Sequence, residues 1–315
     1  MQHAKITIVV PLYNEESMMP LLLSRLSELV SKFPEKIEVL LVDDGSTDKT
    51  ATILEQVALT HDSFCSVLLS RNFGHQAAIS AGLKEAAGTE AVFIIDGDLQ
   101  DPPELLFKFY DHLREGYEIV YGIRKKRKEG ILLRLSYLIF YRLLNKVSNI
   151  EIPLDSGDFC LMSRRAVDVL NQMPEESRFL RGMRSWIGFN QIGVEYERDG
   201  RAAGKPKYSL GRLFNLAVNG LFNFTRVPIK FIFFIGLVSM TVSCIYLVFA
   251  LIKKVFYGIQ PSGFTGLLFI IVLASGVQML SLSIIGEYVS RVFFQTKQRP
   301  LYVIKKRISK AGNNG

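Results

Sequence analysis

The most constraining feature of this sequence is a pair of long uncharged apolar stretches in its last third. Residues 231–251 contain no Asp, Glu, Lys or Arg, and neither do residues 264–286. A bilayer's hydrocarbon core is about 30 Å thick, which a helix of roughly 20 residues spans. Neither stretch offers the polar face of a helix at the surface of a soluble protein. The sequence therefore predicts two transmembrane helices within residues 229–289.

Basic residues flank the two predicted spans unequally, and the turn between the spans holds only Lys253 and Lys254. Cytoplasmic flanks are enriched in Lys and Arg. The apolar run at residues 8–12 is too short for a signal peptide. We expect a multi-pass protein of the inner (cytoplasmic) membrane with its catalytic domain and both termini in the cytoplasm, ending in a basic, lipid-binding tail (290–315). The flanking residues are Arg212, Arg226 and Lys230 before the spans and Arg291, Lys297, Arg299, Lys305, Lys306 and Arg307 after them.

The net charge and the cysteines limit the partners and the compartment. A formal charge of +8 indicates nucleic acid, a membrane surface or anionic ligands as partners. Nucleic acid would explain the charge but neither the spans nor the acidic clusters described below, so no nucleic-acid partner is expected. Cys65, Cys160 and Cys244 form no metal or disulfide pattern, which indicates a reducing compartment.

The first 120 residues alternate short β-rich runs with segments of helical apolar spacing. This alternation predicts an α/β fold, a mainly parallel sheet with helices on both faces. Ligands of such sheets bind beyond the carboxyl ends of the strands. The predicted strands are 6–10, 38–42, 67–69, 91–95 and 118–121, and the predicted helices are 18–30, 48–59, 76–87 and 103–116.

Polar clusters follow three of these strands, at residues 11–16, 43–48 and 96–103. Each alone has an ordinary reading, since Asp-Gly-Ser is common in turns and caps. Together at one sheet edge they predict a divalent-cation site beside a nucleotide pocket, because Mg²⁺ and Mn²⁺ prefer carboxylate oxygens. The sequence has no Gly-x-Gly-x-x-Gly and no Walker loop, which argues against a dinucleotide enzyme or a P-loop kinase.

The order of five motifs resembles family 2 glycosyltransferases of the polyprenyl-phosphate sugar transferase group, which includes dolichol-phosphate mannose synthase and the bactoprenol glucosyltransferases. The motifs are Val-Val-Pro-Leu-Tyr-Asn-Glu, Leu-Val-Asp-Asp-Gly-Ser-Thr-Asp, Arg-Asn-Phe-Gly, Asp-Gly-Asp-Leu-Gln-Asp-Pro-Pro and Ser-Gly-Asp-Phe-Cys-Leu-Met. The resemblance implies a GT-A, Rossmann-like nucleotide-sugar domain over residues 1–208. It also implies a C-terminal two-helix transmembrane hairpin, to which the residue spacing described below adds interfacial amphipathic helices.

The resemblance assigns the donor nucleotide to the first two clusters. Pro11, Tyr13 and Glu15 would line the nucleotide. Asp43 would read the edge of the base, with Asp44 nearby.

The third cluster and a later motif would carry the metal and the chemistry. Asp96 and Asp98 would hold Mg²⁺ or Mn²⁺ on the diphosphate, with Gln100 as a candidate further ligand. Asp158 matches the acidic residue proposed as catalytic base, and Asp155 is the alternative. Because a phosphate monoester has a second pKa of about 6, the acceptor is already ionised at neutral pH. Asp158 would then orient a substrate rather than remove a proton.

A basic segment would offset the charge of the departing diphosphate. Arg201 and Lys207 match the mobile phosphate-contacting segment of the family, and with Asp98 they would stabilise the leaving group. Pro206 replaces the usual small hydroxyl residue, which removes a hydroxyl contact there. His75 has two alternative roles, as a structural residue or as a donor-binding residue. Trp186 is expected in the core rather than as a sugar platform.

Two segments have the pattern of helices that lie in a membrane interface. Residues 131–149, after the basic run 124–128, combine apolar and basic residues at helical spacing and predict contact with anionic lipid. A solvated basic face is the alternative. Residues 209–228 predict a second interfacial helix that leads into the first span.

These features predict inverting transfer of a sugar from a nucleotide-sugar to polyprenyl (undecaprenyl) phosphate. UDP-glucose is the favoured donor, and UDP-GlcNAc, a UDP-arabinose derivative and GDP-mannose are alternatives. A processive polysaccharide synthase normally needs more spans and a Gln-x-x-Arg-Trp motif, whereas residues 181–186 read Arg-Gly-Met-Arg-Ser-Trp. A catalytically dead membrane scaffold would not need Asp96, Asp98 and Asp158. Self-association into a homo-oligomer is compatible with the sequence, because two predicted spans form only a small bundle.

Overall fold

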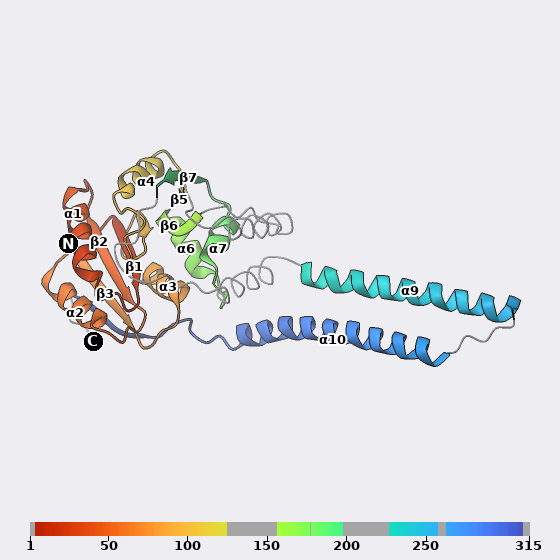
Figure 1. The fold of residues 1–315 in the computed structure, drawn as a ribbon. Helices are drawn as coiled ribbons and strands as arrows, with labels where there is room; N and C mark the ends of the chain where they lie inside the picture. Colours follow the sequence, from red (N-terminus) through yellow and green to blue (C-terminus); the bar gives the residue numbers. More distant parts are fainter. Residues whose placement is uncertain (1–3, 125–155, 177, 198–226, 258–262, 311–315) are drawn as a thin grey trace. The chain divides into compact units, whose positions relative to one another are not determined.

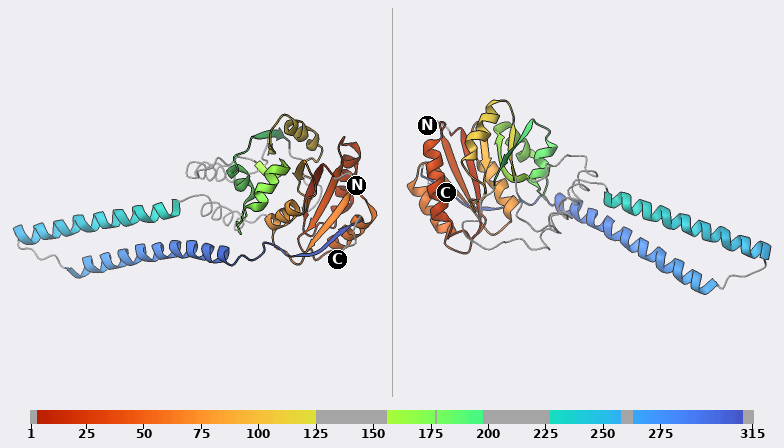
Figure 2. Two further views of the ribbon diagram at one scale, coloured as in Figure 1. Left: turned by 180° about the vertical axis from the view of Figure 1, so that it is seen from behind. Right: turned by 45° about the horizontal axis from the view of Figure 1, so that its top comes forward.

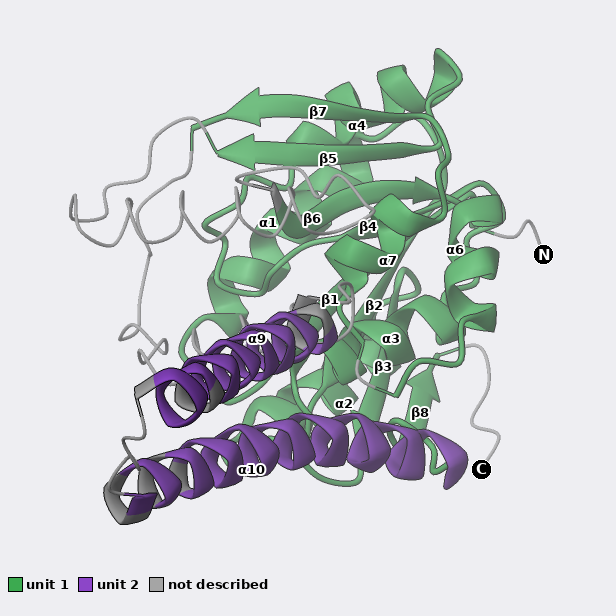
Figure 3. Ribbon diagram, turned by 90° about the vertical axis from the view of Figure 1, so that its right-hand side faces the viewer, with its two compact units in different colours: residues 1–141, 150–209, 299–315 green, residues 142–149, 210–298 purple. Residues whose placement is uncertain are grey.

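The computed structural model describes residues 4–124, 156–176, 178–197, 227–257 and 263–310 (Figure 1). The chain divides into two compact units (Figure 3). Unit 1 comprises Met1–Tyr141, Ile150–Ser209 and Arg299–Gly315, and unit 2 comprises Arg142–Asn149 and Leu210–Gln298.

The first part of unit 1 alternates strands and helices, as the sequence pattern predicts. Every strand and helix predicted up to residue 121 is confirmed, with ends that differ by at most three residues. These elements are β1 (Ile6–Leu12), α1 (Met19–Lys32), β2 (Ile37–Asp43), α2 (Thr50–Thr60), β3 (Phe64–Leu69), α3 (His75–Glu85), β4 (Ala91–Ile94), α4 (Leu105–Arg114) and β5 (Ile119–Arg124).

Five further elements of unit 1 have no counterpart among those sequence-predicted segments. They are β6 (Ser156–Ser163), α6 (Arg164–Gln172), α7 (Leu180–Trp186), β7 (Gln191–Tyr196) and β8 (Ile304–Ser309).

The described strands of unit 1 form one mixed sheet in the order β7-β5-β6-β4-β1-β2-β3-β8. Parallel pairs join β1 to β2 and β4, β2 to β3, and β5 to β7. Only β6 and β8 run against the other strands. The fold is therefore the Rossmann-like α/β fold of GT-A type, with a sheet that is mostly parallel.

Both faces of the sheet are buried, which explains the nearly continuous apolar runs of its central strands. Successive residues of a strand point to opposite faces, so Ile8 and Val10 join one apolar cluster and Val9 joins another. The first cluster includes residues of α1, α2 and α4, and the second includes residues of α3, α6 and α7. The helices are thus divided between the two faces (Figure 2).

Unit 2 consists, in its described part, of the long helices α9 (Val227–Tyr257) and α10 (Gly263–Thr296). They contact each other, and a β-carbon at Gly266 would lie 2.7 Å from the Tyr246 hydroxyl. Among the described residues, one segment, Phe231–Phe256, is long and apolar enough to cross a membrane. The first predicted span is consistent with this segment. The second span and the hairpin are not confirmed and stay predictions.

The end of the chain is not the separate basic tail that the sequence predicts. α10 extends to Thr296, and β8 then pairs antiparallel with β3. Ile308 of β8 is only 4% exposed and belongs to the apolar cluster under α1 and α2. The prediction was wrong for residues 304–309 because three consecutive basic residues were taken for a solvated tail. Charged side chains also suit the edge strand of a sheet, where they prevent pairing with other chains.

Several sequence predictions fall outside the described residues. They concern most of the basic run at 124–128, the helix at 131–149, nearly all of the helix at 209–228, and the side chains Asp155, Arg201, Pro206 and Lys207.

Candidate active site

The direction of the strands gathers the sequence-predicted residues at one edge of the sheet. β1, β2, β4, β5 and β7 all end at this edge, because they run in the same direction. β6 runs against them and therefore begins there. This places Asp158, the third residue of β6, beside the loop that follows β4. The sequence pattern alone contained no sign of this antiparallel strand.

The loops after β1 and β2 are bonded to each other. The backbone N–H of Asn14 donates to Ser46 Oγ at 2.9 Å, and that of Glu15 donates to Thr50 Oγ1 at 3.0 Å. In return the Thr47 N–H donates to the Asn14 side-chain oxygen at 2.8 Å. The two clusters predicted to hold the nucleotide are therefore joined.

The predicted nucleotide-binding side chains differ in their exposure. Pro11 is buried within β1, Glu15 is half-buried, and Tyr13 is 38% exposed. Asp43 is buried at the end of β2, and its carboxylate accepts the Ser46 N–H at 3.1 Å. Burial raises the pKa of Asp43, although the bonds from Ser46 lower it in part.

Asp44 holds the loop that leads into α3. Its two carboxylate oxygens accept the backbone N–H groups of Phe73 and Gly74 at 2.7 and 2.9 Å. Burial raises the pKa of Asp44, while these two bonds oppose the rise. The neighbouring Gly45 has a φ of +68°, and a β-carbon there would lie 2.3 Å from the backbone carbon of Arg71. The second strand end is therefore packed directly on the 71–74 loop.

The loop after β4 carries the predicted metal ligands. Asp98 accepts the Gln100 N–H at 3.3 Å, and Gln100 is buried. Burial raises the pKa of Asp96, and the nearby carboxylates of Asp101, Asp158 and Asp98 raise it further, whereas His75 lowers it.

This donor set fits a divalent cation. No group of three or more His, Cys, Asp or Glu side chains suited to a metal occurs among the described residues. Mg²⁺ is nevertheless often held by one or two carboxylates together with substrate phosphates. A cation between Asp96 and Asp98 would relieve the mutual repulsion of the carboxylates that raises the pKa of Asp96.

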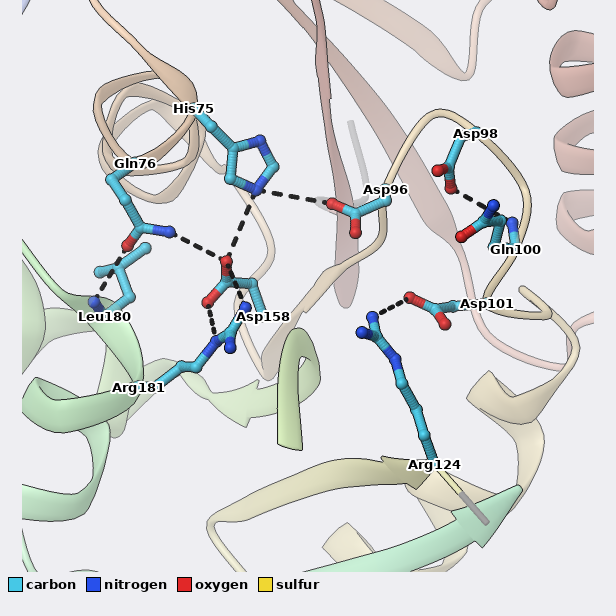
Figure 4. A network of polar contacts seen from close by, with 10 residues as sticks. All are labelled: His75, Gln76, Asp96, Asp98, Gln100, Asp101, Arg124, Asp158, Leu180 and Arg181. Atoms are coloured by element: carbon cyan, nitrogen blue, oxygen red, sulfur yellow. Dashed lines mark hydrogen bonds and ion pairs between the residues drawn. The ribbon is translucent and has the colours of Figure 1, made fainter. Parts of the chain in front are cut away.

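Asp158 lies at the centre of a network of polar contacts (Figure 4). Its carboxylate accepts from Arg181 Nε at 3.0 Å and from Gln76 Nε2 at 2.9 Å. His75 Nε2 lies 3.5 Å from both Asp158 and Asp96, so it connects this network to the predicted metal ligands. Figure 4 shows these side chains converging from α3, β6 and α7.

The charges of this network stabilise one another. Burial alone would raise the pKa of Asp158, but Arg181 and His75 hold it far below the ordinary value of an aspartate. Burial lowers the pKa of His75, yet the bond to Asp158 and the charges of Asp96 and Asp158 raise it to about 9. Asp158 is therefore ionised and paired at neutral pH, which makes it a poor proton acceptor.

A second network fixes the end of the metal loop. Asp101 is almost fully buried and accepts from Arg124 Nη2 at 3.1 Å and from the Tyr196 hydroxyl. Arg124 Nε also donates to the Tyr196 hydroxyl at 3.2 Å. The last residues of β5 and β7 thus hold the loop after β4.

Sequence reasoning missed Gln76, Arg181, Arg124 and Tyr196 as parts of the site. Each contacts its partner across 23 or more positions of the chain, and no local spacing reports such contacts. The expectation of a core Trp186 was wrong, because this side chain is 63% exposed at the end of α7.

Sequence comparison gives the family. Residues 7–170 match the model of Glycosyl transferase family 2. The chain is 40% identical over 306 residues to the uncharacterized glycosyltransferase YkcC of Bacillus subtilis (strain 168), covering 97% of this chain and 94% of the relative.

Two further relatives carry more specific names. The prophage bactoprenol glucosyl transferase homolog of Escherichia coli (strain K12) is 36% identical over 303 residues. The bactoprenol glucosyl transferase of Shigella phage SfX is 35% identical over 304 residues. Each alignment covers 96% of this chain and 99% of the relative. The acidic strand ends, the sheet that joins them and these full-length similarities agree: this chain belongs to glycosyl transferase family 2.

Proposed function

We propose that this protein transfers glucose from UDP-glucose to a polyprenyl phosphate at the cytoplasmic face of a membrane, with inversion at the anomeric carbon. The observation that carries the proposal is the similarity to bactoprenol glucosyl transferases over 96% of the chain. Since each alignment covers 96% of the chain, the aligned region includes the apolar helices α9 and α10 and most of the sheet.

The connectivity of the chain supports two membrane crossings. β8 lies in the same sheet as β1 to β7, although α9 and α10 separate it from them along the chain. If Phe231–Phe256 crosses a membrane, the chain must cross back before β8, because unit 1 lies on one side. The uncharged residues 264–286 of α10 are the segment available for the return. With two crossings unit 1 would lie on one side of the membrane, and the Lys and Arg residues that flank the apolar stretches favour the cytoplasmic side.

The donor would bind along the edge where the strands end. We assign Pro11, Tyr13, Glu15 and Asp43 to the nucleotide, since they lie near the carboxyl ends of β1 and β2 or in the loop that follows β1. Asp44 would act indirectly, because both its oxygens bond the 73–74 backbone.

Asp96 and Asp98 would hold Mg²⁺ or Mn²⁺ on the diphosphate, with Gln100 as a candidate further ligand. The cation would supply positive charge that stabilises the leaving diphosphate. Arg201 and Lys207 would add further charge from the segment after β7.

The acceptor needs no strong base. The second pKa of a phosphate monoester is about 6, so at neutral pH the attacking phosphate oxygen is already negatively charged. The bond from this oxygen to the anomeric carbon forms as the bond between that carbon and the diphosphate oxygen breaks, and the electron pair of the broken bond leaves with the nucleoside diphosphate. Asp158, which is paired with Arg181 and Gln76, would orient groups around the reacting carbon.

A donor screen tests the proposal. Full-length protein in detergent is incubated with undecaprenyl phosphate, Mg²⁺ or Mn²⁺, and labelled UDP-glucose, UDP-GlcNAc, a UDP-arabinose derivative or GDP-mannose. We expect a lipid-linked glucose with one UDP released per sugar, no product with undecaprenol, and no product with the Asp98→Ala variant. Transfer from another donor would change the assigned sugar. No product with any of the four donors would overturn the reaction class.

A further inference from the structure

Gln76, in the first turn of α3, bridges two elements that flank the Asp158 carboxylate (Figure 4). Its Nε2 donates to Asp158 Oδ2 at 2.9 Å, and its Oε1 accepts the backbone N–H of Leu180 at 3.0 Å. The two contacts require the same orientation of the amide, since the reversed amide would lose both bonds. One side chain thus joins α3, β6 and the start of α7.

Arg181, the residue after Leu180, also bonds to the Asp158 carboxylate. Arg181 donates from Nε to Asp158 Oδ1 at 3.0 Å and from Nη2 toward Oδ2 at 3.5 Å. Gln76 therefore bonds both the carboxylate that orients Arg181 and the backbone next to Arg181. Loss of the amide would remove one hydrogen bond from this carboxylate and one from the backbone beside Arg181.

The hydrogen bonds of Asp158 set the direction of its carboxylate. The Asp158 side chain is only 5% exposed, and its two oxygens accept from Gln76 and Arg181. Asp158 and Leu180 also line a small cavity together with Ile94, Cys160, Met162, Leu170 and Arg184. Displacements of about 1 Å near reacting atoms cost about 100-fold in rate.

We propose that Gln76 is a positioning residue for sugar transfer, which holds Asp158 and Arg181 in their working geometry by tying the carboxylate to the first turn of α7. This inference rests on the proposed function. Gln76 acts through its neighbours, so it controls the rate of transfer rather than the binding of the donor.

Two Gln76 variants and one control test the role. Gln76→Glu keeps the size and the acceptor for Leu180 but places a carboxylate against Asp158. Gln76→Leu removes both bonds. Lys84→Ala, an exposed position on the same helix, is the control. The free energy of a hydrogen bond to a charged group corresponds to a factor of about 10 to 100 in a rate or equilibrium constant. We therefore expect kcat to fall by that factor in both variants. The donor KM should stay within about threefold, and Lys84→Ala should match the wild type.

A double variant tests the route through the arginine. Arg181→Lys is measured alone and together with Gln76→Leu. If Gln76 acts through Arg181, the second substitution slows Arg181→Lys by less than about threefold, because coupled residues are not additive. Multiplied losses, an unchanged kcat in the single variants, or a change in KM alone would each overturn the positioning role.

Hydrogen exchange provides a reading that needs no turnover. The Leu180 amide, at the start of α7, should exchange faster in Gln76→Leu than in the wild type and Lys84→Ala, while exchange of the α3 amides stays unchanged. Unchanged exchange at Leu180 would overturn the bridge itself. If the wild type transfers no sugar, the proposed function fails, and the exchange result still decides whether Gln76 holds α7.

Discussion

Ile308 provides a test of whether strand β8 stabilises the sheet of unit 1. The side chain is 4% exposed, it faces the apolar cluster below α1 and α2, and its backbone pairs with Ser66 of β3. Truncating a buried isoleucine to alanine costs about 2–5 kcal/mol. Taking about 3 kcal/mol and a shift of about 2–4 °C per kcal/mol for a unit of this size, Ile308→Ala should lower Tm by about 6–12 °C.

The ion pairs of the same strand provide the matched control. Lys306 pairs with Glu55 at 3.2 Å, but both side chains are more than a third exposed. Exposed pairs contribute about 0.2–1 kcal/mol, so Lys306→Ala should lower Tm by no more than about 4 °C. We therefore expect the burial of Ile308 to contribute more to the stability of β8 in the sheet than this ion pair does.

Thermal unfolding of the full-length protein in detergent, followed by its single tryptophan, measures both variants at one scan rate. Binding to vesicles with and without anionic lipid is measured in parallel. A Tm of Ile308→Ala within about 2 °C of the wild type would refute the reasoning. If Lys306→Ala then also lost binding to anionic vesicles, the C-terminal residues would be a free lipid-binding tail.

Three further perturbations follow from single contacts. Gly45→Ala should weaken UDP binding, measured by calorimetry, by more than about tenfold, because its β-carbon would lie 2.3 Å from the Arg71 backbone. Gly116→Ala is the control, because Gly116 also has a positive φ but an added β-carbon there would meet open space; it should cost only about 1–2 kcal/mol of stability. If Gly45→Ala and Gly116→Ala bound UDP equally well, the close packing of Gly45 on the Arg71 backbone would be contradicted. Tyr196→Phe should lower stability by about 1–3 kcal/mol by removing a bond to buried Asp101, and an unchanged melting curve would refute this. Burial and Glu38 raise the pKa of Cys65 to about 12, so alkylation at pH 8 should be at least about 100-fold slower than in urea and rise toward pH 12. Labelling as fast as in urea would show that the thiol is exposed.

Local sequence pattern was sufficient to predict the strands and helices in the first half of unit 1. The strands from β1 to β5 were predictable because each is a short apolar run that ends in polar residues, and the intervening helices have regular apolar spacing. Met19, Leu22, Leu26 and Leu29 form the buried side of α1 at this spacing. Because ligands bind where parallel strands end, the same pattern also predicts that Asp43 and Asp96 lie at one edge of the sheet.

β6 and β8 were not predictable from local pattern, because the direction and partner of a strand are set by long-range pairing. β6 carries Asp158 to the site by running against β4 and β5. β8 carries three basic residues in a row, and no periodicity distinguishes a charged edge strand from a solvated tail.

The sequence by itself determined the apolar helices, the acidic strand ends and, through its motifs, the family. Only the tertiary structure decided that Asp158 is held by Gln76, His75 and Arg181, and that the chain returns to its sheet after α10. Apolar spacing and residue chemistry are local properties that a sequence displays directly. Contacts such as that between Gln76 and Asp158, 82 positions apart, exist only when the whole sheet has formed.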